Sequence, residues 1–462
     1  MAKRSNEDRP LKTRVIIIRH GQSTYNQLKL IQGHCDDSSL TTDGEQQALR
    51  VGQTLAGIPF NAVWSSPLRR AKKTAELIVG ELRKSTPEIP APQYSDDLKE
   101  ISLPLWEGMS FDDAEAKYPE EYRAWRQDPL NLVMRVATAE GETAFYPVRA
   151  VYEQATRFWQ QLLQAHAGQT ILVVAHSAIN RALLSTAIGL GPEYHNNLFQ
   201  ANCAISILNF AGGWGSPVQI ESMNLTSHMG NPLPPMRGGH RGPRLLLVRH
   251  GETEWNRQGR FQGQIDVPLN DNGRAQAGKA ADFLQSVQID AAYSSSMSRP
   301  KETAEIILQH HPQLSLNLLD EFREISHGEW EGKFESEIEA GYPGLLQQWQ
   351  ASPETVQMPA GENLDQVWER AIAAWKGIVA AHSGAETPQT ILVVAHDAIN
   401  KAILCHVVGQ GPASFWNFKQ GNGAVSVIDY PNGIDSVPVL SAANITTHLS
   451  GSIFDKTAAG AL

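Results

Sequence analysis

Two short stretches of the chain place an arginine and a histidine directly after a run of apolar residues. The first is VIIIRHGQSTYN, from Val15 to Asn26, and the second is LLLVRHGETEWN, from Leu245 to Asn256. A guanidinium group is always charged and offers a planar fork of donors that matches phosphate oxygens. A neutral imidazole can attack phosphorus and carry the phosphoryl group covalently. These side chains together predict chemistry on a phosphate ester.

The same polar side chains recur, in the same order, in both halves of the chain. WSSPLRRAKKTAELI corresponds to YSSSMSRPKETAEII, LKEISLPLWEG to FREISHGEWEG, and QTILVVAHSAIN to QTILVVAHDAIN. A polar residue that persists at equivalent points of two diverged copies is a candidate for function. The shared residues are Arg19 and Arg249, His20 and His250, Asn26 and Asn256, Gln32 and Gln262, Arg70 and Arg299, Glu100 and Glu324, Glu142 and Glu362, and His176 and His396.

These residue types form a set suited to phosphoryl transfer if they converge on one pocket. Two arginines would bind the phosphoryl oxygens, one histidine would attack phosphorus, and the other would donate to the oxygens as charge builds in the transition state. A carboxyl group with a raised pKa could protonate the leaving alkoxide and then activate water. Metal binding by the histidines is disfavoured, because no HxH, HExxH or cysteine-rich spacing occurs and the neighbouring arginines would repel a cation.

The elements that must position these side chains are predicted to be strands that alternate with helices. RVIIIRH, FNAVWSS and TILVVAH are short runs rich in β-branched residues, as is typical of buried strands. Residues 41–57 and 66–83 have helical spacing, and Asp43 is the predicted cap of the first of these helices. The alternation predicts an α/β fold of three αβα layers, with helices on both faces of a mostly parallel sheet. Ligands of such sheets bind beyond the carboxyl ends of the strands, where we expect the site.

The repeat also predicts the domain organisation. A chain of 462 residues is too long for one typical core, and each copy has the size of an ordinary domain. We expect a first domain over residues 12–230, a linker rich in proline and glycine over 231–243, and a second domain over 244–450.

Composition restricts the partners and the compartment. The formal net charge of −10 argues against a nucleic-acid or anionic-membrane binder. No apolar run has the length of a membrane span, and the first dozen residues do not resemble a secretory signal. Cys35, Cys203 and Cys405 are an odd, scattered set that favours reduced thiols over disulfides or a zinc site. We therefore expect a cytoplasmic protein with a small phosphorylated substrate, without nucleic-acid or membrane partners.

The chain resembles the histidine phosphatase superfamily, the phosphoglycerate mutase-like group, in four motifs. These are the RHG motif, the second arginine in its SSxLxRAxxTA-like segment, the glutamate before WEG and the late histidine. Both copies are similar to it over most of their length. The resemblance implies a phosphohistidine intermediate, with no metal and no organic cofactor. It further implies that His20 and His250 are nucleophiles and that Glu100 and Glu324 donate protons. The residues that it implies bind the phosphoryl group are Arg19, Arg70, His176, Arg249, Arg299 and His396. It places Asn26, Gln32, Asn256 and Gln262 near the phosphate, and Glu142 and Glu362 at the pocket rim.

The activity that the resemblance implies is hydrolysis of small sugar or sugar-acid phosphates. The stretches RHGQSTYN, FYPVRAVYEQA and NCAISILNF of the first copy are similar to plant members of the superfamily that act on sugar-acid phosphates. One alternative is a mutase-type isomerase that uses the same intermediate. Another is a chain with one catalytic domain and one regulatory phosphate-binding domain. The ERHYG-like motif and longer insert of the mutases are absent from the sequence, and both copies keep the five-residue set, which favours hydrolysis.

The two copies depart from each other beside the acid. Leu103 and Pro104 of the first copy replace His327 and Gly328 of the second. Proline fixes φ and removes a backbone donor, so we expect a differently shaped loop next to Glu100 and a different substrate preference.

Overall fold

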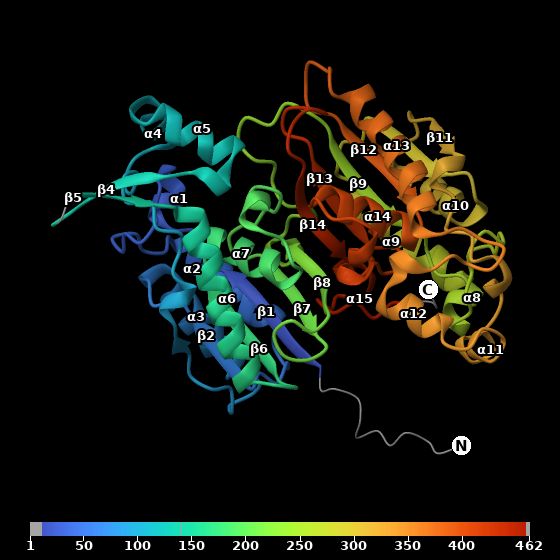
Figure 1. The fold of residues 1–462 in the computed structure, drawn as a ribbon, viewed down its shortest axis with the longest axis horizontal. Helices are drawn as coiled ribbons and strands as arrows, with labels where there is room; N and C mark the ends of the chain where they lie inside the picture. The colour runs from blue at the N-terminus through green and yellow to red at the C-terminus, as the bar shows by residue number, and fades with distance from the viewer. Residues whose placement is uncertain (1–11, 140, 459–462) are drawn as a thin grey trace. The chain divides into compact units, whose positions relative to one another are not determined.

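The computed structural model describes residues 12–139 and 141–458, which divide into two compact units (Figure 1). Residues up to Ile220, with Asn224–Asn231, belong to the first unit, and Glu221–Met223 with all residues from Pro232 belong to the second. Most of the predicted linker groups with the second unit, where the Arg241 N–H donates to the Pro431 carbonyl oxygen at 2.8 Å. The bounds given above for the two domains stay a prediction.

The first unit is built on a mostly parallel sheet. Its strands lie in the order β8-β7-β1-β6-β2-β3, in which β1, β6, β2 and β3 are parallel and β7 is antiparallel to β1. Residues Glu221–Met223 of β8 group with the second unit. The strand bounds are β1 Thr13–Arg19, β2 Ala62–Ser65, β3 Gln93–Tyr94, β6 Thr170–Ala175, β7 Ile205–Phe210 and β8 Val218–Leu225. A separate hairpin of β4 Met134–Thr138 and β5 Gly141–Phe145 extends from this unit (Figure 1).

Helices pack on this sheet in pairs, α2 against α3 and α6 against α7. The helix bounds are α1 Thr24–Leu28, α2 Thr42–Thr54, α3 Arg69–Leu82, α4 Phe111–Lys117, α5 Pro119–Gln127, α6 Pro147–Ala165 and α7 Ser177–Ala187. Helix α2 lies within the predicted stretch of residues 41–57, but the predicted cap is wrong. Thr41, not Asp43, accepts the hydrogen bond from the Gly44 amide, because its side chain lies three residues before that donor.

The second unit repeats this plan with strands in the order β11-β10-β12-β9-β13-β14. Strands β9, β12, β10 and β11 are parallel, and β13 is antiparallel to both β9 and β14. The strand bounds are β9 Arg244–Arg249, β10 Ala291–Ser295, β11 Leu316–Leu319, β12 Thr390–Ala395, β13 Val425–Asp429 and β14 Val439–Ile445. The helix bounds are α8 Glu254–Gln258, α9 Asp271–Leu284, α10 Ser298–Ile307, α11 Glu335–Gly341, α12 Leu345–Ala351, α13 Leu364–His382, α14 Asp397–Val407 and α15 Thr447–Ser450.

The central strands are buried on both faces, as their nearly continuous apolar runs require. Every residue from Val15 to Ile18 and from Leu245 to Val248 is fully buried. Helices can cover both faces only when the strands carry apolar side chains on both, so the prediction of an α/β fold with a mostly parallel sheet is confirmed in each unit. No helix among the described residues is long and apolar enough to cross a membrane.

Candidate active sites

Two histidines meet at the carboxyl ends of neighbouring parallel strands in each unit. His20 follows β1 and His176 follows β6, and their ring centroids lie 5.1 Å apart. His250 and His396 occupy the same places after β9 and β12, with centroids 5.2 Å apart. The pairing of the strands therefore brings together side chains that are more than a hundred residues apart in the sequence.

The ring of the first histidine in each pair is oriented by the residue that follows it. His20 Nδ1 lies 2.7 Å from the Gly21 carbonyl oxygen, and His250 Nδ1 lies 2.7 Å from that of Gly251. A carbonyl oxygen can only accept, so Nδ1 carries the proton and Nε2 keeps its lone pair. In the second unit Arg299 Nε donates to His250 Nε2 at 3.3 Å, in keeping with that assignment. Nε2 is thus the atom able to attack phosphorus.

All four histidines are held neutral. Burial is the largest cause that lowers the pKa of each well below 6.5, and the neighbouring arginines lower the pKa further. A neutral imidazole is the form that a nucleophile needs.

The second histidine of each pair is fixed by a serine that the sequence analysis did not single out. His176 Nε2 lies 2.8 Å from Ser66 Oγ, and His396 Nε2 lies 2.9 Å from Ser295 Oγ. Among the described residues, no partner is present for the buried Nδ1 of His176 or of His396. An unsatisfied buried nitrogen at this position is suited to donate to a phosphoryl oxygen.

The predicted arginines are buried beside these rings. Arg70 Nη2 donates to the Gly33 carbonyl oxygen at 2.9 Å, and Arg19 Nη1 donates to that of Gln200 at 2.8 Å. Within the described part of the chain, Nε of Arg19 and of Arg70 has no hydrogen-bond partner. Burial lowers the pKa of Arg19 to about 10, which still leaves the group charged at neutral pH. An anion with several acceptor oxygens fits these donors.

Arg299 repeats this arrangement in the second unit, where Nη2 donates to the Gly263 carbonyl oxygen at 2.8 Å. Arg249 Nη1 donates to the Gln420 carbonyl oxygen at 2.6 Å. Burial lowers the pKa of Arg299 to about 10.

The predicted proton donors lie at the N-termini of the helices that follow the late histidines. Glu100 Oε1 accepts from the amides of Ala178 at 2.9 Å and Ile179 at 3.3 Å. Glu324 Oε2 accepts from the Ala398 amide at a longer 3.4 Å. Burial, and then the nearby Asp397 carboxylate, raise the pKa of Glu324. The surroundings of Glu324 therefore favour its protonated form.

Asn26 and Gln32 hold the loop that follows His20. Asn26 Oδ1 accepts from the Ser23 amide at 3.1 Å and from Asn202 Nδ2 at 3.1 Å, and Gln32 Oε1 accepts from Ser23 Oγ at 3.0 Å. Asn202 also donates to the His20 carbonyl oxygen at 2.9 Å. The second unit repeats the contacts through Asn256, Gln262, Thr253 and Asn422. These amides hold the loop that carries the predicted nucleophile, and their contact with substrate stays a prediction.

The two glutamates predicted at the pocket rim have different surroundings. Glu142 is exposed on β5, where it pairs in register with Ala137 of β4. Glu362 Oε2 instead accepts from the Ser326 amide at 2.9 Å and pairs with Arg370 Nη2 at 2.8 Å. Glu362 is thus tied to the loop of its proton donor, whereas Glu142 lies on a hairpin. A rim function of either residue stays a prediction.

A side chain on the loop after the RHG motif reaches the acid loop in both units. His34 Nε2 lies 2.7 Å from the Glu100 carbonyl oxygen, and Gln264 Nε2 donates to that of Glu324 at 3.0 Å. Sequence analysis missed this pair, because histidine and glutamine differ and the comparison of copies retained identical residues.

The loops beside the two acids differ in backbone conformation. Gly328 has φ +54°, and a Cβ atom there would lie 2.1 Å from the Pro359 carbonyl oxygen. Proline at the equivalent position 104 cannot adopt positive φ, so the first loop must follow another path. His327 is fully buried, and burial lowers its pKa to about 3. Its ring packs edge-on against that of Phe261.

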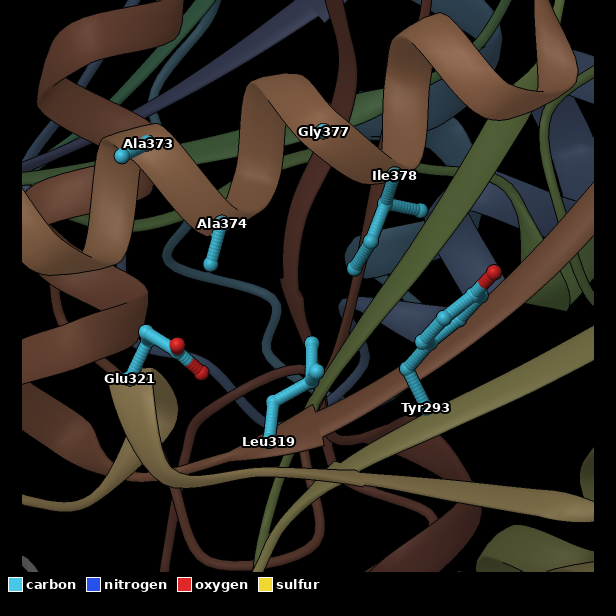
Figure 2. Close-up of a pocket in the computed structure, with 7 residues that line it drawn as sticks. All are labelled: Tyr293, Leu319, Glu321, Ala373, Ala374, Gly377 and Ile378. Atoms are coloured by element: carbon cyan, nitrogen blue, oxygen red, sulfur yellow. The ribbon is translucent and has the colours of Figure 1, made fainter.

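A cavity of about 390 Å³ opens beneath α13 in the second unit (Figure 2). Tyr293 and Leu319 of the sheet edge face Ala374 and Ile378 of the helix across it, and Glu321 lies at its end. None of the residues that line it is a predicted site residue. It therefore lacks the paired arginines and histidines that a phosphate ester requires.

Comparison with known proteins agrees with this geometry. The profile of the histidine phosphatase superfamily (branch 1) matches residues 15–223 and 245–441. The chain is 30% identical over 455 residues to 2-carboxy-D-arabinitol-1-phosphatase of Triticum aestivum, which covers 94% of this chain and 86% of the wheat protein. It is 30% identical over 450 residues to a probable 2-carboxy-D-arabinitol-1-phosphatase of Arabidopsis thaliana, with 94% and 88% covered. Phosphoserine phosphatase 1 of Hydrogenobacter thermophilus is 34% identical over 206 residues, which are 45% of this chain and 94% of that protein.

The two matched segments together span most of the chain, and each contains one complete set of the converging side chains. The chain therefore belongs to the histidine phosphatase superfamily and is a metal-independent phosphatase.

Proposed function

We propose that this phosphatase hydrolyses 2-carboxy-D-arabinitol 1-phosphate or a closely related sugar-acid phosphate, through a phosphohistidine in each domain. The observation that carries the substrate class is the similarity over both domains to 2-carboxy-D-arabinitol-1-phosphatase of wheat. The single-domain relative that acts on phosphoserine matches less than half of the chain. The buried guanidinium groups support binding of a phosphate ester.

The hydrogen bonds around His20 support the mechanism that we propose. Nε2 attacks phosphorus while the ester P–O bond breaks, and the Glu100 carboxyl gives its proton to the leaving alkoxide. Arg19, Arg70 and His176 Nδ1 donate to the phosphoryl oxygens as negative charge builds on them. The Glu100 carboxylate then takes a proton from water, and the hydroxide attacks phosphorus and breaks the P–N bond. This step releases inorganic phosphate and returns His20 and the glutamic acid to their first states.

The second domain would follow the same steps. His250 would be the nucleophile, Arg249, Arg299 and His396 would bind the phosphoryl group, and Glu324 would be the proton donor. The shared orientation of the two nucleophilic rings supports this assignment.

A panel of substrates tests the proposal. We expect wild-type protein to release phosphate from 2-carboxyarabinitol 1-phosphate faster than from pentose phosphates, phosphoserine or phosphoglycerates. His20→Ala and His250→Ala should each remove phosphohistidine from one domain, and the double variant should form none. Equal rates on every ester would refute the substrate class. Acid-labile phosphoenzyme in the double variant would refute the mechanism, and interconversion of phosphoglycerates without phosphate release would identify a mutase.

A further inference from the structure

The two sites differ at the first and fifth residues after the late histidine. The first site has Ser177 and Arg181, and the second has Asp397 and Lys401. All four residues lie on α7 or α14, the helices whose N-termini face the proton donors. The difference therefore changes the charge beside the acid.

Asp397 is a buried counter-ion of two cations in the second site. Its Oδ1 lies 3.2 Å from Arg249 Nη1 and its Oδ2 lies 2.6 Å from Lys401 Nζ, and the three side chains are each at most 6% exposed. The Lys401 ammonium also lies over the Trp416 ring, 4.5 Å from its centroid. Charges buried this deeply require a partner, and Asp397 supplies it.

The first site has no equivalent carboxylate. Arg181 is buried, and its Nη1 donates to the His195 carbonyl oxygen at 3.1 Å. Within residues 12–139 and 141–458, it forms no ion pair and its Nε has no hydrogen-bond partner. The negative charge that acts most strongly on Arg19, Arg70 and Arg181 is that of Glu100. Glu100, the proposed proton donor, thus bears the negative charge that favours the charged form of these three arginines.

The hydrogen bonds to the two acids reflect the same difference. Glu100 accepts from two amides at the start of α7, whereas Glu324 accepts from one amide of α14, at 3.4 Å. Asp397 occupies the first turn of α14 and adds a second negative charge next to Glu324. Two neighbouring carboxylates disfavour joint ionisation, which agrees with the raised pKa of Glu324.

Other charged groups face Glu324 from each surrounding element. Arg249 of β9 and Arg299 of α10 lower its pKa, and Arg370 of α13 donates to its carbonyl oxygen at 3.1 Å. Arg370 is itself paired with Glu362. Asp397 is the group on α14 that opposes these cations.

We propose that Asp397 is a positioning residue that neutralises Arg249 and Lys401, so that Glu324 keeps the proton needed by the leaving alkoxide. The inference rests on the proposed function, in which Glu324 is the proton donor. Its consequence is that the two domains share one chemistry but differ in pH dependence. The Asp397 carboxylate thereby influences the basic limb of the pH profile of the second site.

The test measures kcat/KM against pH with a pentose phosphate as probe. In a chain with His20→Ala, only the second site can turn over. We expect Asp397→Asn to move the basic limb of its profile down by about one pH unit, because loss of the carboxylate removes the charge that favours protonated Glu324. Asp365→Asn, an exposed change in the first turn of α13, is the matched control and should move nothing.

A second variant, in which the first site gains the carboxylate, tests the inference without relying on Asp397→Asn alone. In a chain with His250→Ala, Ser177→Asp should move the basic limb of the first site upward. Active variants whose basic limbs do not move would overturn the inference and leave the proposed function intact. If no probe is hydrolysed, the proposed function fails, and infrared titration of the Glu324 carboxyl still decides the inference. Its midpoint must fall in Asp397→Asn, and an unchanged midpoint overturns the inference.

Discussion

Close backbone contact between the RHG loop and a helix N-terminus makes one glycine a sensitive position. Gly273 lies in the first turn of α9, where its amide donates to the Asn270 side-chain oxygen at 2.8 Å. A Cβ atom at this position would lie 2.0 Å from the Glu252 carbonyl oxygen, two residues after His250. Contacts of this kind are not tolerated below 3.0 Å, so Gly273→Ala must separate the two backbones by about 1 Å.

The displacement should affect both stability and turnover. Overpacking of a dense interior costs about 1–3 kcal/mol, which we expect as the loss in free energy of unfolding. Misplacement of a reacting group by about 1 Å can lower the rate about 100-fold, and we expect this loss in kcat at the second site. Arg249 lies on the same segment as the proposed nucleophile, whereas Arg299 lies on α10 and should keep its place, so we expect KM to change less than kcat.

The assay uses a chain with His20→Ala, so that turnover reports on the second site alone. Gly278→Ala is the matched control, since it makes the same change in the same helix, with no atom within 4 Å of the added carbon. This control should keep its kcat and gain about 0.5–1 kcal/mol of stability, because alanine favours the helix. Wild-type kcat and unfolding free energy in Gly273→Ala would refute the reasoning.

Three further predictions concern buried polar groups. Ser295→Ala removes the hydroxyl bound to His396 and should lower the kcat of the second site about tenfold, which corresponds to about 1.4 kcal/mol. Steady-state rates that do not fall would contradict this prediction. Arg244→Met removes the ion-pair partner of the buried Asp429 carboxylate and should lower the free energy of unfolding in urea by about 3–5 kcal/mol. Adding Asp429→Leu should restore much of this loss. An equal loss in the single and the double variant would count against the ion pair. The pKa of His176 is lowered in the folded state, so the unfolded chain binds a proton below pH 6.5 that the native chain does not, and stability falls as the pH falls. His176→Asn should remove about 1.4 kcal/mol of this loss between pH 7.5 and 5.5, and an unchanged pH dependence of unfolding would refute the burial argument.

The fold and the central site residues were predictable because they leave strong local patterns. Continuous β-branched runs indicate strands buried on both faces, and the polar groups at their ends were duplicated. The structure brings His20 beside His176 and His250 beside His396, as convergence at the carboxyl ends requires.

The supporting contacts were not predictable by the same reasoning. Ser66 acts through a hydrogen bond to a ring nitrogen, and Asn202 through hydrogen bonds to a backbone oxygen and to Asn26. Apart from the duplication of both residues, no sequence pattern indicates such bonds. Asp397 and His34 were not predicted, because only residues identical in the two copies were taken as candidates and both positions differ between the copies. The cap of α2 was misplaced because Thr41 and Asp43 are both good capping residues, and only the backbone geometry decides between them.

The acid loops also bear on how the copies diverged after gene duplication. Proline at position 328 would need φ of about −65° where the backbone holds +54°, and the turn at Pro359 leaves no room even for a methyl group. Glycine at position 104 would not restore the buried imidazole, because Leu103 is buried in its place. Conversion of either loop into the other therefore requires the residues at both positions to change together.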